Sequence, residues 1–180
     1  MMRLLNRVFT RILLLAVLAL GALVALGMFV MSESRNNLYE QKKADIRHVV
    51  EAVATALNKQ KKSLNGSKLL VLGVAYKKDV DDLRESPTLK IMQLLQGRGA
   101  HVEYNDPYFP QLHRMRHYNY EGMKSVPLSP QTLGAYDGVI IATDHSTYDY
   151  NAIVDSSKLV VDTRNATRRV VRHRNRIALC

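Results

Sequence analysis

The feature that most constrains the fold is an alternation of short apolar runs and helical segments after Ser67. The run from Lys68 to Tyr76, KLLVLGVAY, is typical of a strand buried on both faces. Similar runs are Ala100–Asn105, Gly138–Thr143 and Lys158–Asp162, with a short extra strand expected at Val126–Leu128. The segments predicted as helices are Pro87–Gly97, Ser129–Ala135 and Tyr148–Asp155. This order predicts an α/β, Rossmann-like and mostly parallel sheet with helices on both faces.

The predicted sheet also indicates where a binding site lies. In open sheets of parallel strands, ligands bind beyond the carboxyl ends of the strands. We therefore expect functional residues directly after Tyr76, Asn105, Thr143 and Asp162.

A charge-free stretch precedes this domain. Residues 12–31 contain no charged side chain, and Arg3, Arg7 and Arg11 come before them. Twenty helical residues span about 30 Å, the thickness of a hydrocarbon core. A signal peptide is the alternative, but its apolar core is shorter and ends at a small-residue cleavage site. We predict a transmembrane anchor at residues 1–35, a single-pass chain, and an undetermined side for the domain because basic residues flank both ends.

An amphipathic helix is expected to link the anchor to the domain. Apolar residues recur at helical spacing within residues 36–62, namely Ile46, Val49, Val50, Val53 and Leu57. The helix should end near Asn58, before a turn at Asn65–Ser67. Its apolar face offers a surface for a homodimer.

The net charge of +10 is concentrated at the two ends of the chain. Residues 1–62 contribute +6, residues 63–165 contribute −1, and residues 166–180 contribute +5. A nearly neutral central region does not favour a basic groove, so we expect no nucleic-acid partner. Residues 168–180 are predicted to form an exposed basic tail.

A single cysteine, Cys180, limits the chemistry that the chain can carry out. One sulfur forms no disulfide within the chain and builds no thiolate metal site. A terminal residue is also poorly fixed for covalent catalysis. We therefore predict neither a catalytic residue nor a metal site.

The segment after the first predicted strand combines cations with a helix start. It reads GVAYKKDVDDLRESP and contains only one glycine of the dinucleotide fingerprint G-x-G-x-x-G. Lys77, Lys78 and Arg84 near a helix N-terminus favour a phosphate-bearing ligand. Because Asp79, Asp81, Asp82 and Glu85 balance these cations, a solvated charged loop is an equal alternative.

Several motifs together resemble one family. The segment GVAYKKDVDDLRESPTLKIMQLL is similar to the signature of the C-terminal UDP-binding domain of the UDP-glucose/GDP-mannose dehydrogenase family. The closest likeness is to the branch that oxidises UDP-N-acetylhexosamines. Further matches in the family's order are YNDPY from Tyr104, ATDH from Ala142 and VDTRNAT from Val161. The resemblance begins near His48, covers about two thirds of the chain, and assigns residues 63–167 to this domain.

The resemblance implies roles for individual residues. Tyr76, Lys77 and Arg164 are implied to bind a UDP-sugar, and Arg84 to contact the cofactor NAD held on another domain. From the residues themselves, we interpret Asp106 as a turn former, His145 as structural, and Asp162 as ordering the loop that bears Arg164.

The resemblance also implies parts that this sequence lacks. The family oxidises a sugar alcohol to a carboxylate with NAD, through a catalytic cysteine in its N-terminal half. Neither that cysteine segment nor the G-x-G-x-x-G motif occurs here, so the chain alone is expected to be inactive. A separate chain that supplies the missing dehydrogenase half would restore an enzyme.

The first 47 residues are similar instead to the start of membrane chemoreceptors. This likeness suggests a composite chain with its junction near residues 44–50. Three hypotheses follow: a membrane-tethered UDP-sugar-binding remnant, an enzyme subunit that needs a second chain, and a receptor-like protein whose α/β domain is a scaffold. UDP-sugars and NAD are cytosolic, so the first two require the domain inside the cell.

Overall fold

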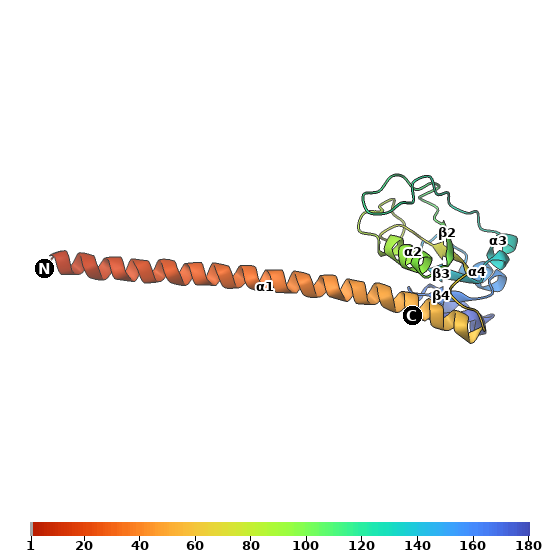
Figure 1. Ribbon diagram of the computed structural model, residues 1–180, viewed down its shortest axis with the longest axis horizontal. Coiled ribbons are helices and arrows are strands. Elements are labelled where there is room, and N and C mark those ends of the chain that lie inside the picture. The colour runs from red at the N-terminus through yellow and green to blue at the C-terminus, as the bar shows by residue number, and fades with distance from the viewer. Residues whose placement is uncertain (1) are drawn as a thin grey trace. The chain divides into compact units, whose positions relative to one another are not determined.

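The computed structural model describes residues 2–180, with the side chains of residue 18 and residues 20–180. The chain divides into two compact units, Met1–Ala44 and Asp45–Cys180. The first helix, α1 (Met2–Lys59), is continuous through this division, as Figure 1 shows. The segments predicted as an anchor and as an amphipathic linker are therefore parts of one helix.

In the first unit, α1 exposes a series of large apolar side chains. They include Leu18, Leu20, Leu23, Val24, Leu26, Met28, Phe29, Val30 and Met31. Within the described residues, no helix has a stretch that is both long enough and apolar enough to cross a bilayer. Part of the predicted span, residues 12–17 and residue 19, has side chains outside the described set.

The second unit is built on a five-stranded sheet. The strands are β1 (Lys68–Leu72), β2 (His101–Asn105), β3 (Gly138–Ile141), β4 (Val160–Asp162) and β5 (Ile177–Leu179). Their order is β2-β1-β3-β4-β5, and all four pairings are parallel. In the register, Leu69 lies opposite Val102 on one side and Gly138 on the other. The α/β prediction is confirmed.

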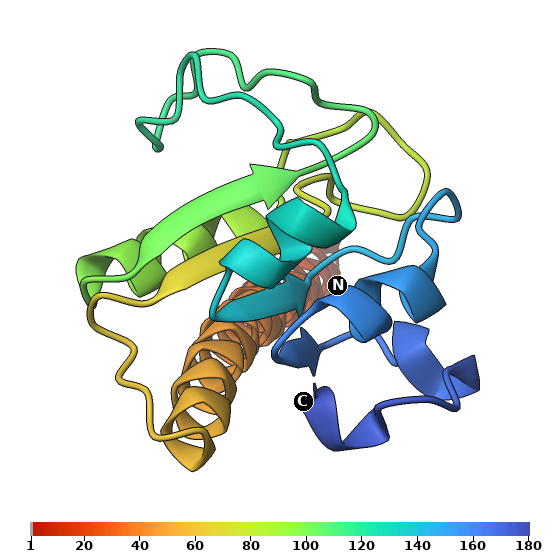
Figure 2. The same cartoon turned by 90° about the vertical axis from the view of Figure 1, so that its right-hand side faces the viewer.

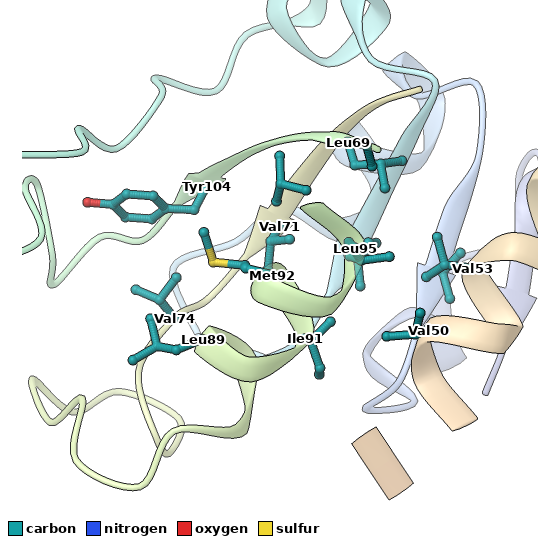
Figure 3. Close-up of a cluster of buried hydrophobic side chains, with 14 of the residues drawn as sticks. Val50, Val53, Leu69, Val71, Val74, Leu89, Ile91, Met92, Leu95 and Tyr104 are labelled. Carbon is teal, nitrogen blue, oxygen red and sulfur yellow. The ribbon is translucent and has the colours of Figure 1, made fainter. Parts of the chain in front are cut away.

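Side chains of successive strand residues alternate between two apolar cores. Leu69 and Val71 of β1 contribute to the first core, together with residues from the end of α1 and from α2 (Pro87–Gly97). Figure 3 shows Val50 and Val53 of α1 beside Leu95 of α2 in this core.

The opposite face of the sheet carries the second core. Leu70 and Leu72 of β1 pack there with Leu133 of α3 (Pro130–Ala135) and Val154 of α4 (Tyr150–Ser156). Figure 2 shows α3 and α4 on this side of the sheet. Helices cover both faces, as the pattern of apolar runs predicts.

Local signals explain where the helices begin. Ser129 and Thr132 form a capping box at the start of α3, and the Asp149 carboxylate accepts the N–H groups of Asn151 and Ala152 at the start of α4. Ser86 occupies the N-cap position of α2 but makes no side-chain capping hydrogen bond: its hydroxyl donates instead to the carbonyl of Val74 at 2.6 Å. Ser86 therefore fastens the preceding loop rather than the helix.

The amphipathic part of α1 is used inside the domain. Val50, Val53 and Leu57 are fully buried in the first core, while Ile46 and Val49 pack against it. Because the core occupies this apolar face, the homodimer predicted through it would need another surface.

Three expectations about irregular segments are corrected. The segment Val126–Leu128 is not a strand of the described sheet: the N–H of Val126 donates to the carbonyl of Tyr104 in β2 at 2.8 Å, but the carbonyl of Val126 accepts the side chain of Asn105, and the pairing with β2 does not continue. The predicted basic tail, residues 168–180, begins within the 3-10 helix η1 (Ala166–Arg169), forms η2 (Arg174–Arg176) and then adds β5 to the sheet. Its exposed arginines lie in this connection. Cys180 is not frayed, since its N–H donates to the carbonyl of Asp162 at 3.1 Å.

Candidate functional site

The loop from β1 to α2 begins at a glycine that no other residue can replace without strain. Gly73 has a φ of +81°, and a Cβ at this position would lie 2.5 Å from both the Cβ and the carbonyl oxygen of Thr143. Its N–H donates to the carbonyl of Asn105 at 2.9 Å. The loop can therefore pass directly against the ends of β2 and β3. Figure 2 shows the loops after β1 and β2 leaving the sheet on the side to which the strands point.

A buried carboxylate holds the beginning of this loop. Asp106, which follows β2, accepts the N–H groups of Val74 at 2.7 Å, Ala75 at 3.1 Å and Tyr108 at 2.8 Å. Burial opposes ionisation of Asp106, but the hydrogen bonds from His145 and from these backbone groups bring the pKa of its carboxyl below the ordinary value. Asp106 is therefore a carboxylate that the fold surrounds with donors.

A buried histidine joins this carboxylate to the middle of the loop. His145 has no exposed surface and lies between the rings of Tyr108 and Tyr148, at centroid distances of 5.0 and 5.7 Å. Its Nδ1 accepts the N–H of Asp79 at 2.9 Å, and its Nε2 lies 3.2 Å from Oδ2 of Asp106. A nitrogen that accepts a backbone N–H carries no proton, so in the neutral ring the proton is on Nε2 and points to Asp106.

The residue that His145 contacts is itself fixed by its side chain. Asp79 has a φ of +59°, and its carboxylate accepts the Oγ–H of Ser146 at 2.6 Å and the N–H of Ser146 at 2.8 Å. These two hydrogen bonds, the hydroxyl first, lower the pKa of Asp79. Some of the charged groups of the loop, such as Asp79, are thus engaged in hydrogen bonds that hold the shape of the loop.

The structure places the predicted pair Tyr76 and Lys77 between these two fastenings. Tyr76 is 42% exposed, and Nζ of Lys77 lies 5.3 Å from the centroid of its ring. The N–H of Tyr76 donates to the carbonyl of Asp82 at 2.7 Å. Among the described residues, no carboxylate forms an ion pair with Lys77. An aromatic face and a cation are therefore presented together to solvent.

Arg84, which the family resemblance connects with NAD, is engaged within its own loop. Its Nε and Nη2 donate to the two carboxylate oxygens of Asp82 at 3.0 and 2.9 Å, and this pairing lowers the pKa of Asp82. The side chain is nevertheless 88% exposed. A ligand phosphate would have to compete with Asp82 for this guanidinium.

Arg164 lies on the loop that follows β4. The buried carboxylate of Asp162 accepts the N–H groups of Arg164 at 2.9 Å, Ala166 at 3.1 Å and Thr167 at 2.8 Å. The predicted ordering role of Asp162 is confirmed. The Nε of Arg164 lies 3.4 Å from Oδ1 of Asp144, and the side chain is half exposed. Among the described residues, no hydrogen bond or ion pair joins Arg164 or Arg84 to Tyr76 or Lys77.

Sequence reasoning underrated two residues of the site. Asp106 does form the predicted turn, through the N–H of Tyr108, but it also fastens the loop after β1. His145 is buried, as a structural residue would be, yet its two ring nitrogens contact two different loops. Both residues follow strand ends, and this position at the carboxyl edge of the sheet was the available signal.

The chemistry available at this edge is recognition of an anion. Among the residues that the structure describes, no group of three or more His, Cys, Asp or Glu side chains could hold a metal ion. The Cys180 thiol lies 3.4 Å from Nδ1 of His48, and burial raises its pKa, so the unreactive protonated form is favoured. Exposed cations on fixed loops remain as the functional groups of the edge.

Comparison with known proteins finds similar nucleotide-sugar dehydrogenases. UDP-glucose 6-dehydrogenase of Rhizobium meliloti (strain 1021) is 31% identical over 122 residues, which cover 64% of this chain and 27% of that protein. UDP-N-acetyl-D-glucosamine 6-dehydrogenase of Pseudomonas aeruginosa is 28% identical over 101 residues, or 56% of this chain and 23% of that protein. The chain thus spans about a quarter of the length of these relatives.

The fold and a family model lead to the same group. A solved UDP-glucose dehydrogenase from the hyperthermophilic archaeon Pyrobaculum islandicum is 28% identical with a TM-score of 0.52, covering 74% of this chain and 29% of that one. The model of the UDP-glucose/GDP-mannose dehydrogenase family, UDP binding domain, matches residues 70–169, more than half of the chain. The chain therefore belongs to the UDP-glucose/GDP-mannose dehydrogenase family, through the family's UDP binding domain.

Proposed function

We propose that the second unit binds the uridine diphosphate part of a nucleotide sugar at the carboxyl edge of its sheet. The proposal rests on one observation: the residues that match the UDP binding domain include the loops that bear the exposed Tyr76, Lys77 and Arg164. The match to the UDP binding domain, residues 70–169, spans the loops that leave the carboxyl ends of β1, β2 and β3 and the first part of the loop after β4. The exposed Tyr76 and Lys77 lie on the first of these loops and Arg164 on the last.

The chemistry of these side chains suits a diphosphate. A lysine ammonium is a mobile point charge, while an arginine guanidinium can form two parallel hydrogen bonds to phosphate oxygens. Lys77 has no carboxylate partner among the described residues, and Arg164 has only a long contact of 3.4 Å with Asp144. Both cations are thus available to an anionic ligand at little cost.

Titration of UDP into the full chain tests the proposal. We expect calorimetry to show saturable binding, and Lys77→Ala to weaken it about tenfold or more, because a hydrogen bond to a charged group contributes about 1.5–3 kcal/mol. Lys90→Ala is the matched control: Lys90 is an exposed lysine of α2, and its Nζ donates to the side chain of Gln93. Equal binding by the two variants would contradict a role for Lys77, and absence of binding by the unsubstituted chain would contradict the proposal.

We further propose that the domain serves NAD-dependent oxidation of a UDP-glucose-type or UDP-N-acetylglucosamine-type sugar, with Arg84 directed to the cofactor. Its support is the family membership and the 88% exposure of Arg84. Since the chain spans about a quarter of its relatives, a dehydrogenase half carried elsewhere would supply NAD binding and the catalytic cysteine.

Reconstitution tests this enzymatic role. The purified chain with UDP-glucose or UDP-N-acetylglucosamine and NAD should produce no NADH, because no activated nucleophile lies at the site. Addition of the N-terminal half of a relative should restore NADH production, and Arg84→Ala should reduce it. NADH formed by the chain alone would refute the expectation.

We also propose that residues 12–31 attach the chain to a membrane. The stretch is free of charge, and its described side chains from Leu20 to Met31 include many large apolar ones that are exposed.

An alkaline wash of membranes tests this proposal. The unsubstituted chain should stay with the membranes. Arginines in place of Leu23 and Leu26 should release it, since each arginine costs about 2.5–3.5 kcal/mol near the centre of a bilayer. Arginine at Leu38, also exposed on α1, is the control. Release of the unsubstituted chain would overturn the proposal. The likeness to chemoreceptors stays a prediction.

A further inference from the structure

The loop that bears Tyr76 and Lys77 is fastened at two points, and one side chain contacts both. The first point is Asp106, which accepts the N–H groups of Val74 and Ala75. The second is Asp79, whose N–H donates to Nδ1 of His145. Because Nε2 of His145 also meets Asp106, a single buried imidazole connects the two points.

Only three residues, Tyr76 to Lys78, lie between these points. Because the segment is so short, fixing its two ends restricts the backbone angles of all three residues. Tyr76 and Lys77 expose their side chains, and the aromatic ring beside the ammonium does not fix the lysine backbone by itself. The direction in which this pair faces solvent therefore depends on Asp79 staying in place.

The groups around His145 show that the contact is built into the fold. The ring has no exposed surface and is flanked by Tyr108 and Tyr148. Asp106 accepts from Nε2, which leaves Nδ1 as the acceptor, so the carboxylate selects the tautomer that Asp79 requires. Carboxylates orient metal-ligating histidines in the same way, by accepting the N–H of the ring nitrogen that does not bind the metal.

We propose that His145 is a positioning residue of the nucleotide site: it sets the Tyr76–Lys78 segment for the diphosphate by holding the backbone N–H of Asp79. This inference rests on the proposed function. It assigns His145 no contact with the ligand. Its effect comes from preorganisation, because a segment already ordered in its bound shape loses less entropy when the ligand binds.

Two substitutions of the same residue separate positioning from plain structural support. In His145→Asn, the side-chain oxygen stands near the place of Nδ1 and can accept from Asp79, but the reach to Asp106 is lost. In His145→Gln, the longer amide keeps a donor toward Asp106 and loses the acceptor for Asp79. The asparagine leaves the larger cavity, so it should destabilise the domain more.

Binding and stability should then change in opposite order. We expect His145→Gln to weaken UDP binding about tenfold and His145→Asn to weaken it about threefold or less, although the asparagine variant melts at the lower temperature. Hydrogen exchange of the Asp79 amide should become about tenfold faster in His145→Gln and much less so in His145→Asn. Affinities that fall in the same order as the melting temperatures would overturn the inference.

A further variant keeps the test decisive if the histidine variants do not fold. Ser146→Ala removes the 2.6 Å hydroxyl contact to the Asp79 carboxylate at an exposed position. It should fold normally, speed exchange of the Asp79 amide and weaken UDP binding about threefold. Unchanged affinity together with faster exchange would overturn positioning.

The same experiments distinguish this inference from the proposed function. If Lys77→Ala weakens UDP binding while His145→Gln and Ser146→Ala bind normally, the UDP site stands and the positioning role falls. If the unsubstituted chain binds no UDP, the proposed function falls, and with it the role of His145 toward that ligand.

Discussion

Replacement of Asp106 with alanine is expected to lower the free energy of unfolding by about 3–5 kcal/mol. The buried carboxylate accepts three backbone N–H groups, from Val74, Ala75 and Tyr108, and meets Nε2 of His145. Each donor left without a partner in a buried position costs free energy. Urea denaturation of the variant and of the unsubstituted chain measures the difference.

An exposed aspartate of the same loop provides the control for this prediction. Asp81→Ala should change the free energy of unfolding by no more than about 0.5 kcal/mol, because Asp81 lies on the surface. If Asp106→Ala lowered the free energy of unfolding by no more than this amount, water would replace the carboxylate at no cost. The Asp106 carboxylate would then not be what holds the loop.

The Asp106 carboxylate also makes stability depend on acidity. Its pKa is lowered in the folded domain by the hydrogen bonds from His145 and the backbone, which outweigh burial. Its contribution to stability is therefore complete above the pKa of the unfolded chain, near 4 for an ordinary aspartate, and is lost as pH falls through the lower folded value. Removal of Asp106 should flatten the acid side of the stability profile below about pH 4.

Alanine at Gly73 is expected to destabilise the domain by about 3 kcal/mol or more. Two effects add at this position: the φ of +81°, which disfavours any Cβ, and the overlap of that Cβ with Thr143 at 2.5 Å. Because one of the two atoms is the Thr143 carbonyl oxygen, no side-chain rotation relieves the overlap. The end of β3 or the loop after β1 has to move, so UDP binding should weaken as well.

A second glycine isolates the steric effect. Gly66 has the same φ of +81°, but a Cβ there would meet nothing within 4 Å. Gly66→Ala should therefore cost only the backbone strain, about 1 kcal/mol. Equal losses in the two variants would show that the approach of Gly73 to Thr143 is not the tight contact that the structure describes.

Patterns of apolar residues predicted most of the fold. Strand β1 is recognisable because both of its faces are buried, and α2 begins and ends at the predicted Pro87 and Gly97. The strand β5 was missed because its sequence, IAL, is a short run that follows five arginines. These arginines led to the prediction of an exposed basic tail. The place of β5 in the sheet depends on pairing with β4, which a local pattern does not contain.

The exposed residues of the site were easier to predict than the buried ones. Tyr76 and Lys77 come at the end of the first apolar run, so their place at the carboxyl edge was predicted from that run, although β1 ends at Leu72 rather than at the predicted Tyr76. Their proposed role in binding came from the family resemblance. The contacts of Asp106 and His145 join loops 31 to 66 residues apart in sequence. Such contacts arise from tertiary packing, and only the relationship between strand ends and ligand sites pointed to them.

Because the sheet is purely parallel, its amino edge lies opposite the nucleotide loops and can carry a reporter of unfolding. This edge is closed by turns such as the one at Gly66, whose N–H donates to Gly99, and by Asp137, which pairs with Lys62 and accepts from the N–H of Lys68. A fluorophore could be attached at this edge to a residue that replaces the exposed Lys158. The fluorophore would then lie a full strand length from the nucleotide loops. Such a reporter could follow unfolding without touching the groups that bind.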